Sequence, residues 1–87
     1  MKRRTIYKYP MPEYYSLISL DPLGKVILVD MQNEVPTMWV ELDPDAKGVS
    51  REFAIIGTGR EVPDDAQHRG SFQDGVFVWH LYERGLQ

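Results

Sequence analysis

Residues Lys25–Leu42, with the sequence KVILVDMQNEVPTMWVEL, give the clearest indication of the fold class. The first part, Lys25–Gln32, predicts a strand whose β-branched run is buried on both faces, before Asp30 and Gln32 return it to solvent. Asn33–Pro36 contains residues typical of a chain reversal. Thr37–Leu42 then alternates between two sets of side chains, as a second strand does. The whole stretch therefore predicts a β-hairpin.

The alternation within the second strand of this hairpin assigns its faces. Met38, Val40 and Leu42 fall on one face, and Trp39 falls on the other with polar neighbours. Val76–Tyr82 (VFVWHLY) follows the same rule. Its two faces are Phe77, Trp79 and Leu81 on one side and Val78, His80 and Tyr82 on the other. We expect one face of Val76–Tyr82 to lie in the core and the other to be free to meet a ligand or partner.

Turn residues divide the rest of the chain into further short segments. Asp21–Gly24 fits a reversing turn, and Asp74-Gly75 is a hairpin-turn dipeptide. Asp43–Ser50 and Glu61–Ala66 have the composition of surface loops. The remaining strand-forming segments are Ile6–Tyr9, Tyr14–Leu20, Arg51–Ile56, Gln67–Phe72 and Val76–Tyr82. Prolines directly after the first of these predict that it is an edge strand.

Together these features predict an all-β fold. About seven short strands with short connections, and no lasting helical apolar stripe, favour a small, mostly antiparallel sandwich or barrel. Pro12–Leu20 and Pro63–Ala66 leave room for one short helical turn. With 87 residues the chain is long enough for one core, so we expect a single domain over residues 1–87.

Composition places the chain among ordinary globular proteins. Hydrophobic residues make up 43% and charged residues 26%, which excludes the polar bias of disordered proteins. There is no cysteine, so a reducing compartment, the cytoplasm, is expected. The basic start Met1–Arg4 is not followed by the apolar run of an export signal. No apolar stretch approaches the roughly 20 residues that cross a bilayer, so no membrane association is expected.

Charge is unevenly distributed along the chain. The net charge is −3, although Lys2, Arg3, Arg4 and Lys8 contribute +4 within the first ten residues and so leave −7 for the rest. An acidic body is a poor surface for phosphate groups, which need lysine and arginine along it. General nucleic-acid binding is therefore not expected.

No arrangement typical of an enzyme is found in the sequence. The chain lacks a thiol, and its two histidines, His68 and His80, do not stand in a metal-binding or catalytic spacing. The carboxylates of Asp43–Asp45 and Asp64–Asp65 fall in loops, where solvated surface is their ordinary role. We therefore expect a non-enzymatic protein that uses no metal and no cofactor.

Gly57-Thr58-Gly59-Arg60 is the local motif that most suggests a ligand. Its two glycines allow backbone N–H groups to converge on an anion, and its arginine adds charge-assisted hydrogen bonds. The motif lacks the lysine of a P-loop and the third glycine of a dinucleotide fingerprint. It is a candidate phosphate site, with a plain β-turn as the alternative.

Aromatic residues are numerous for so short a chain, with five tyrosines and two tryptophans. Tyr7, Tyr9 and Trp39 are candidate contacts, because exposed rings stack on nucleobases or anchor protein interfaces. Core filling is the alternative, above all for Trp39 and Trp79. His80 is a minor further candidate, with a hydrogen-bonded structural histidine as its alternative.

Three motifs taken together resemble a family of uncharacterised small proteins found in phages and prophages. They are Ile6–Pro10 (IYKYP), Val35–Pro44 with the pattern VP..W..LDP, and Gly57–Gly59 (GTG) followed by Val78–His80 (VWH). The resemblance covers nearly the whole chain. It implies a small protein in the cytoplasm of a bacterial host, where such proteins often inhibit or sequester components of host defence.

The leading hypothesis from this resemblance is a counter-defence protein. A small homo-oligomer would capture a nucleotide-type immune signal, with its phosphate at Gly57–Arg60 and its base against Tyr7, Tyr9 or Trp39. One alternative is an inhibitor that binds a host defence protein through its acidic surface or an exposed strand edge. Another is an accessory protein of phage assembly. Oligomerisation is expected because pairing across a two-fold axis protects edge strands.

Overall fold

The computed structural model describes residues 3–85 of the chain. It contains seven strands and, within those residues, no helix. The strands are β1 (Thr5–Pro10), β2 (Tyr15–Leu20), β3 (Lys25–Gln32), β4 (Val35–Leu42), β5 (Val49–Gly57), β6 (Gln67–Asp74) and β7 (Phe77–Arg84). The all-β prediction is confirmed. The described part of the chain accordingly has no helix that could span a membrane.

Neither segment considered for a helical turn is helical. Tyr15–Leu20 is strand β2. Pro63–Ala66 closes a single turn, in which the N–H of Ala66 donates to the carbonyl of Pro63 over 3.1 Å. Strand β5 begins at Val49, so the loop expected over Asp43–Ser50 is shorter than its composition indicates.

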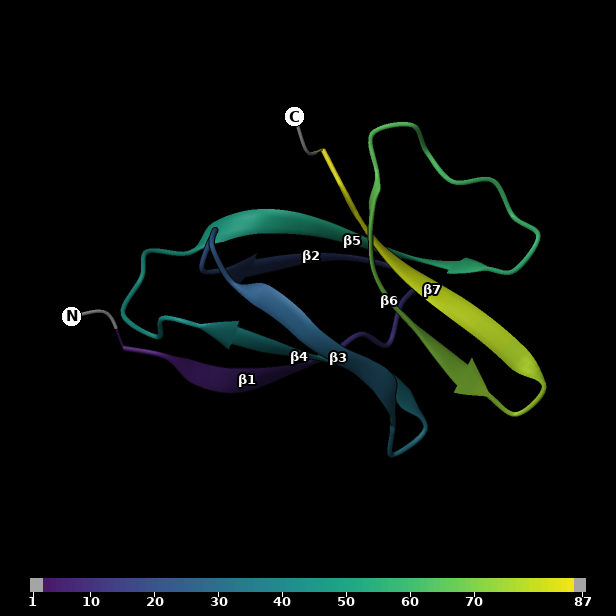
Figure 1. Cartoon of the computed structure of the whole chain (residues 1–87), viewed down its shortest axis with the longest axis horizontal. Helices are drawn as coiled ribbons and strands as arrows, with labels where there is room; N and C mark the ends of the chain where they lie inside the picture. The colour runs from purple at the N-terminus through teal and green to yellow at the C-terminus, as the bar shows by residue number, and fades with distance from the viewer. Residues whose placement is uncertain (1–2, 86–87) are drawn as a thin grey trace.

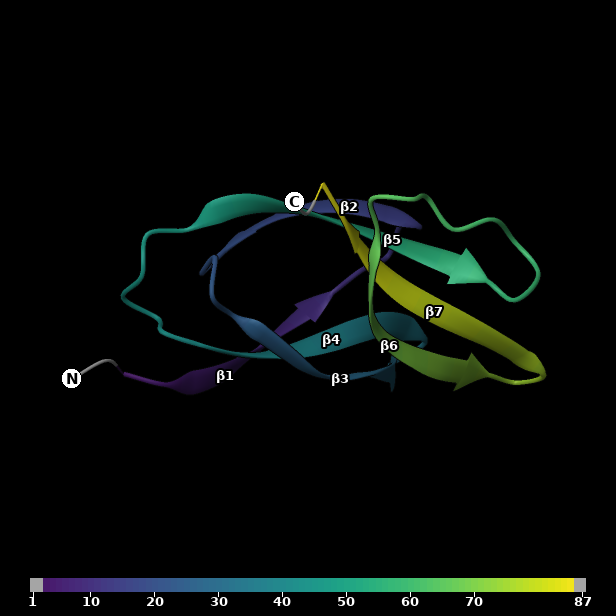
Figure 2. The same cartoon turned by 45° about the horizontal axis from the view of Figure 1, so that its top comes forward.

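The strands form two antiparallel sheets that pack as a sandwich (Figure 1). One sheet has three strands in the order β1-β4-β3, and the other has four in the order β2-β5-β7-β6. The edge strands β3 and β6 lie side by side in both views (Figures 1 and 2). In the described chain no ladder joins one sheet to the other, so the fold is a sandwich rather than a closed barrel. Strand β1 lies at an edge, as predicted.

A glycine allows the two sheets to approach each other at β3 and β6. A Cβ atom added at Gly70 would lie 2.6 Å from Cγ2 of Val29, closer than real Cβ contacts. Val29 is 6% exposed and belongs to the core. The seam between the sheets therefore depends on the absence of a side chain at Gly70.

The core lies between the sheets and draws apolar residues from both. Its buried members are Met11, Leu20, Val29, Met38, Val40, Leu42, Phe53, Ile55, Phe72 and Leu81. The face of β4 formed by Met38, Val40 and Leu42 is the one that is buried. Thr37 is buried as well, although it belongs to the opposite face. Its hydroxyl donates to the carbonyl of Val35 over 3.0 Å, which satisfies the buried oxygen.

The hairpin predicted over Lys25–Leu42 is confirmed, because β3 and β4 pair antiparallel. Its loop is shorter than the predicted Asn33–Pro36. Only Asn33 and Glu34 form the turn, with φ of 51° and 66°, as a type I′ turn requires. The two residues that follow them already pair in β4.

The prediction that the β-branched run of Lys25–Gln32 is buried on both faces is wrong. Ile27 and Leu28 are 46% and 50% exposed, and the register of β3 shifts between Val26 and Leu28. Such an irregularity turns side chains away from the pleat that the sequence alone predicts. In the described chain, no layer covers the outer face of the three-stranded sheet.

The second predicted hairpin forms with its turn displaced by one residue. Asp74 pairs with Phe77 as the last rung of the β6–β7 ladder, so the loop is Gly75 and Val76 rather than Asp74-Gly75. Gly75 has a φ of 60°. A glycine at the first loop position is the requirement of a type II′ turn, which explains why the loop begins there.

Buried ion pairs close one end of the four-stranded sheet. The side chain of Glu83 on β7 is 2% exposed and accepts hydrogen bonds from Arg51 Nε (2.7 Å), Arg51 Nη2 (2.8 Å) and Arg69 Nε (3.0 Å). Arg51 Nη1 also donates to the carbonyls of Asp21 and Gly24, both at 2.9 Å. We term this cluster of Asp21, Arg51, Arg69 and Glu83 the sealed end.

The ionisation of Glu83 reflects this environment. Burial raises the pKa of its carboxyl group, but hydrogen bonds and positive charge from Arg51 and Arg69 act in the opposite direction and outweigh burial. The pKa of Glu83 therefore lies below its usual value, and the carboxylate is ionised at neutral pH.

Candidate binding cleft

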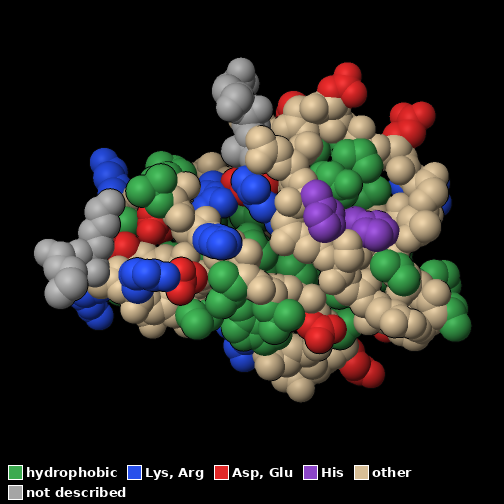
Figure 3. Space-filling model, viewed as in Figure 1, with side chains coloured by type: hydrophobic (Ala, Val, Ile, Leu, Met, Phe, Trp, Pro, Cys, Tyr) green, Lys and Arg blue, Asp and Glu red, His purple; other side chains and the backbone are tan. Residues whose placement is uncertain are grey.

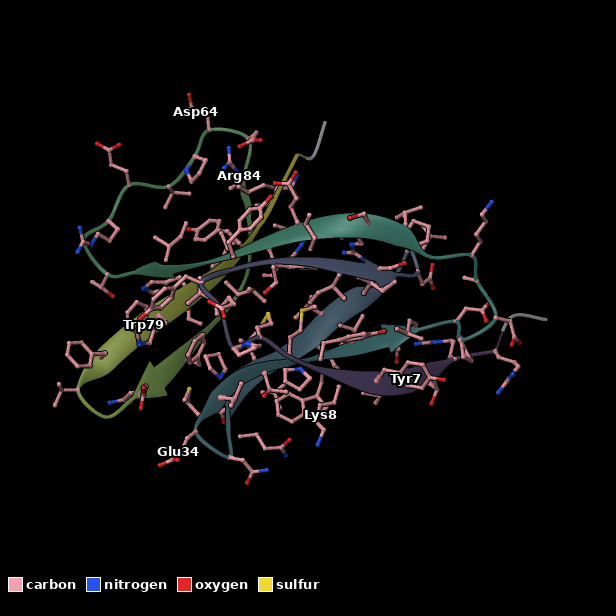
Figure 4. All side chains as sticks on the ribbon, turned by 180° about the vertical axis from the view of Figure 1, so that it is seen from behind. Tyr7, Lys8, Glu34, Asp64, Trp79 and Arg84 are labelled. Carbon is pink, nitrogen blue, oxygen red and sulfur yellow. The ribbon has the colours of Figure 1, made fainter. Side chains whose placement is uncertain are left out.

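A cleft of about 230 Å³ opens at the other end of the four-stranded sheet. Its walls come from the segment between β1 and β2, the β3–β4 hairpin and the β6–β7 hairpin. The apolar side chains that line it include Met11, Tyr14, Met31, Phe72 and Trp79. Figure 4 shows Trp79 and Arg84 towards opposite ends of β7, so the cleft and the sealed end lie apart. We term this region the open end.

Two aromatic rings form a wall of the cleft. The ring centroids of Tyr14 and Trp79 are 5.5 Å apart with an interplanar angle of 31°. Trp79 packs against the core, whereas Tyr14 is 68% exposed. Phe72 is 5% exposed and supplies buried apolar surface beneath them. An aromatic face carries partial negative charge, so such a wall attracts a cation as well as an apolar group.

Three carboxylates surround this aromatic wall. Glu13, Glu34 and Asp74 line the cleft, and among the described residues none of the three has an ion pair or a side-chain hydrogen bond. Glu34 occupies the tip of the β3–β4 hairpin, and Asp74 ends β6. No lysine or arginine of the described chain lines the cleft. The open end is therefore apolar inside and negatively charged at its border.

The Gly57–Arg60 motif borders a shallow pocket on the other side of the same two rings. This pocket, of about 380 Å³, is lined by Tyr14, Trp79, Arg60 and Glu61 among others. Gly57 lies close to Trp79, since an added Cβ would be 3.1 Å from Cζ3 of the indole. Arg60 is exposed and makes no ion pair with the described residues. The motif thus lies beside Tyr14 and Trp79 rather than beside Tyr7, Tyr9 or Trp39, the rings proposed from the sequence.

Most donors of the motif are used within the protein. The N–H of Arg60 donates to the carbonyl of Gly57 (3.1 Å), and the N–H of Thr58 donates to the carbonyl of Val78 (3.4 Å). The hydroxyl of Thr58 donates to the same carbonyl over 3.0 Å. Gly59 has a φ of 90°, which explains the second glycine by backbone conformation alone. The local geometry is that of a β-turn, and the Arg60 side chain remains as its charged donor.

The other aromatic candidates lie in the three-stranded sheet. Tyr7 and Tyr9 belong to β1, and Trp39 belongs to β4. Figure 4 shows Tyr7 and Trp79 at opposite sides of the molecule. Tyr9 packs against the core, where burial and the neighbouring Tyr7 raise the pKa of its hydroxyl. Trp39 is half-buried. The structure does not bring these three rings to Gly57–Arg60.

His80 is held in a chain of hydrogen bonds on the outer face of the four-stranded sheet. Its Nε2 lies 3.0 Å from the hydroxyl of Thr58, and its Nδ1 lies 2.7 Å from the hydroxyl of Ser71. His68 Nε2 lies 2.9 Å from the same Ser71 hydroxyl, and the two histidines are neighbours on the surface (Figure 3). Because the hydroxyl of Thr58 donates to the carbonyl of Val78, it accepts a hydrogen bond from Nε2 of His80. The alternative of a hydrogen-bonded histidine therefore describes His80.

Sequence reasoning did not select the residues of the open end. Glu13 and Tyr14 precede β2 and resemble ordinary loop and strand residues in sequence, and core filling was the stated alternative for Trp79. The signal that identifies them is spatial, because three separate connections meet there. In the described chain no group of three or more histidine, aspartate or glutamate side chains is placed to hold a metal ion.

Comparison with other proteins gives a family but no characterised relative. No curated protein and no solved structure matches the chain. The family described as Domain of unknown function (DUF7352) matches residues 2–87, which is nearly the whole sequence. This agrees with the expectation of an uncharacterised family. The chain belongs to the DUF7352 family.

Proposed function

We propose that the protein is a non-enzymatic binding protein whose open end captures a cationic side chain of a partner protein. One observation carries the proposal: Glu13, Glu34 and Asp74 border an aromatic cleft, and no described residue neutralises them. Charges that have no partner within a protein are free to pair with one outside it. An arginine or lysine of the partner supplies the complementary charge.

The size and lining of the cleft suit a single side chain. Its volume of about 230 Å³ lies below the roughly 300–1,000 Å³ of sites for drug-sized ligands. A lysine or arginine stem packs on apolar surface such as that of Met11 and Phe72, while the charged head lies against an aromatic face. Tyr14 and Trp79 provide that face, and the carboxylates complete the binding of the head group.

Titration with short acetylated peptides tests this function. We expect a peptide with one arginine or lysine to release or absorb heat in calorimetry and to shift amide resonances around Tyr14 and Trp79. A matched peptide with norleucine at that position should do neither. Asp74→Asn should weaken binding, whereas Asp64→Asn, in the loop between β5 and β6, should not (Figure 4). Equal binding of the charged and the neutral peptide, or of neither, contradicts the proposal.

A second candidate function is the capture of a nucleotide-type signal in the shallow pocket. The observation that favours it is Arg60, which lies beside Tyr14 and Trp79 and forms no ion pair with any described residue. The base would stack on the rings and the phosphate would bind Arg60. Heat on titration with cyclic nucleotides or ADP-ribose derivatives, lost in Arg60→Ala and retained in Asp74→Asn, would favour this candidate over the first.

The biological setting remains a proposal that rests on the resemblance of the sequence motifs to phage and prophage proteins. In that setting the protein acts in the cytoplasm of a bacterial host and inhibits a component of host defence. The partner of the open end is then a host defence protein, and the ligand of the shallow pocket is an immune signal. A role in phage assembly is distinguished by detection of the chain in purified particles.

A further inference from the structure

The outer edge of strand β2 is an unused row of backbone hydrogen-bonding groups. The N–H of Ile55 donates to the carbonyl of Tyr14 over 2.8 Å, which fixes the phase of the β2–β5 ladder. Because these groups alternate in an antiparallel pair, Tyr15, Leu17 and Ser19 direct their N–H and C=O groups away from β5. No described residue forms a hydrogen bond with these outward groups.

The edge of β1 differs, although it is also free of a ladder. The N–H of Met11 donates to the carbonyl of Pro36 over 2.7 Å, so Ile6, Lys8 and Pro10 direct their backbone groups outward. Proline has no N–H to donate, and lysine opposes the approach of another strand. The sequence of β1 therefore protects its edge.

The edges of β3 and β6 are protected in a different way. These two strands lie side by side, and each has a register irregularity. Strand β2 has no charged residue, no proline and no irregularity over Tyr15–Leu20. Among the described strands, β2 is thus the edge without any of the features that prevent pairing with another chain.

We propose that β2 pairs antiparallel with β2 of a second copy of the chain, about a two-fold axis at Leu17. In this register Leu17 lies opposite Leu17 of the other copy, and Tyr15 lies opposite Ser19. Each of these pairs exchanges two backbone hydrogen bonds, so every outward group of the strand is used. A self-complementary edge of this kind fits a symmetric dimer, in which the same surface meets itself.

The side chains around the axis support the same partner. Leu17 is 61% exposed and Tyr15 is 49% exposed on the outer face of β2. Directly opposed residues of an antiparallel pair share one face, so the two copies of Leu17 contact each other. No charge lies on β2, so the acidic character of the chain does not oppose this contact. The inference goes beyond the proposed function, because the cleft is complete within one chain.

The mass of the full chain in solution tests the dimer. Light scattering behind size-exclusion chromatography should give twice the chain mass for the wild type. Leu17→Lys places two like charges at the axis and should halve the mass. Ile6→Lys, at an apolar position 53% exposed on β1, is the matched control and should leave the dimer intact. A monomeric wild type, or a dimer that survives Leu17→Lys, overturns the proposal.

A cross-link provides a second measurement that does not depend on a destabilising substitution. The chain has no cysteine, so Leu17→Cys introduces one thiol per copy. Opposed residues in a hydrogen-bonded pair have Cα atoms about 5.5 Å apart, within the range of a disulfide. Mild oxidation should convert Leu17→Cys to a covalent dimer and leave Ser19→Cys, which faces Tyr15, as single chains. Equal cross-linking of the two variants overturns the register.

Discussion

The sealed end and the open end lie towards opposite ends of β7, but their charged residues differ in whether they have partners. The open end is completed by the segment between β1 and β2 and by the β3–β4 hairpin. At the sealed end Glu83 is buried between Arg51 and Arg69, and each charge has its partner inside the chain. At the open end Glu34 and Asp74 border apolar surface without a partner among the described residues. The sheet thus has one end whose charges hold the fold together and one whose charges are exposed to a ligand.

This difference between the two ends predicts which substitutions affect stability and which affect binding. A buried ion pair that loses one partner leaves an uncompensated charge in the interior, which is costly. An exposed carboxylate loses little when it is neutralised. Substitutions at the sealed end should therefore unfold the protein, and substitutions at the open end should change binding alone. Four predictions follow this contrast.

The largest effect is expected for Glu83→Ala. This change leaves the guanidinium groups of Arg51 and Arg69 without their carboxylate, and the side chain of Arg51 is only 10% exposed. We expect the free energy of unfolding to fall by about 3–5 kcal/mol. Chemical denaturation measures it, with Asp64→Ala as a control that should change it by less than about 0.5 kcal/mol. A loss of less than about 1 kcal/mol would show that the ion pairs of the sealed end contribute little to the free energy of unfolding.

Acid should weaken the sealed end through protonation of Glu83. The pKa of Glu83 is lowered in the folded state from its usual value of 4.5. Its contribution to stability is therefore complete above that value, and it is lost as the pH falls through the lower, folded pKa. Denaturation curves of the wild type should show this decline below about pH 4.5, and those of Glu83→Gln should show a smaller one. Identical declines would remove Glu83 as the cause.

Tyr14→Ala should separate the two properties at the open end. The ring is mostly exposed and contacts Trp79, so the free energy of unfolding should fall by only about 0.5–1.5 kcal/mol. Affinity for an arginine peptide should fall by about 1 kcal/mol, or roughly fivefold, because one face of the cation site is lost. Phe77→Ala removes another exposed ring near Trp79 and should leave the affinity unchanged, since Phe77 does not line the cleft.

The smallest effect on stability is expected for Glu34→Gln combined with Asp74→Asn. Neither carboxylate has a partner among the described residues, so the free energy of unfolding should change by less than about 0.5 kcal/mol. Binding of an arginine peptide should nevertheless weaken, and its dependence on salt should become shallower. A large loss of stability in this variant would mean that the open end holds the fold after all.

The fold class could be predicted because its signals, alternation within strands and turn residues between them, lie within short stretches of sequence. Alternation in Thr37–Leu42 put Met38, Val40 and Leu42 on one face, which is the buried face in the structure, and turn residues identified both hairpins. The errors concern features that depend on neighbouring strands. The irregularity in β3 and the exposure of Ile27 depend on what covers the sheet. The alternation of residue types along a strand does not indicate this.

The sequence indicated that the candidate binding site contains aromatic rings, but not which rings form it. Abundant aromatic residues indicated that some rings are exposed, but the order of the strands decides which ones meet. Tyr7 and Gly57 belong to different sheets, whereas Tyr14 reaches Trp79 because the connection from β1 to β2 crosses between the sheets. Partners far apart in sequence, such as Arg51 and Glu83, could not be paired without that topology.

The contact of Gly70 with Val29 has a consequence for motion. The backbone of Gly70 and the side chain of Val29 leave no room for an added methyl group. Because of this close packing, β3 and β6 cannot slide past each other, and the two sheets are held rigidly along these strands. If the two sheets separate transiently, they must do so at the opposite edges, where β1 and β2 lie. Amide hydrogens of β3 and β6 beside this contact should exchange with solvent most slowly, and those of the free edge of β1 first.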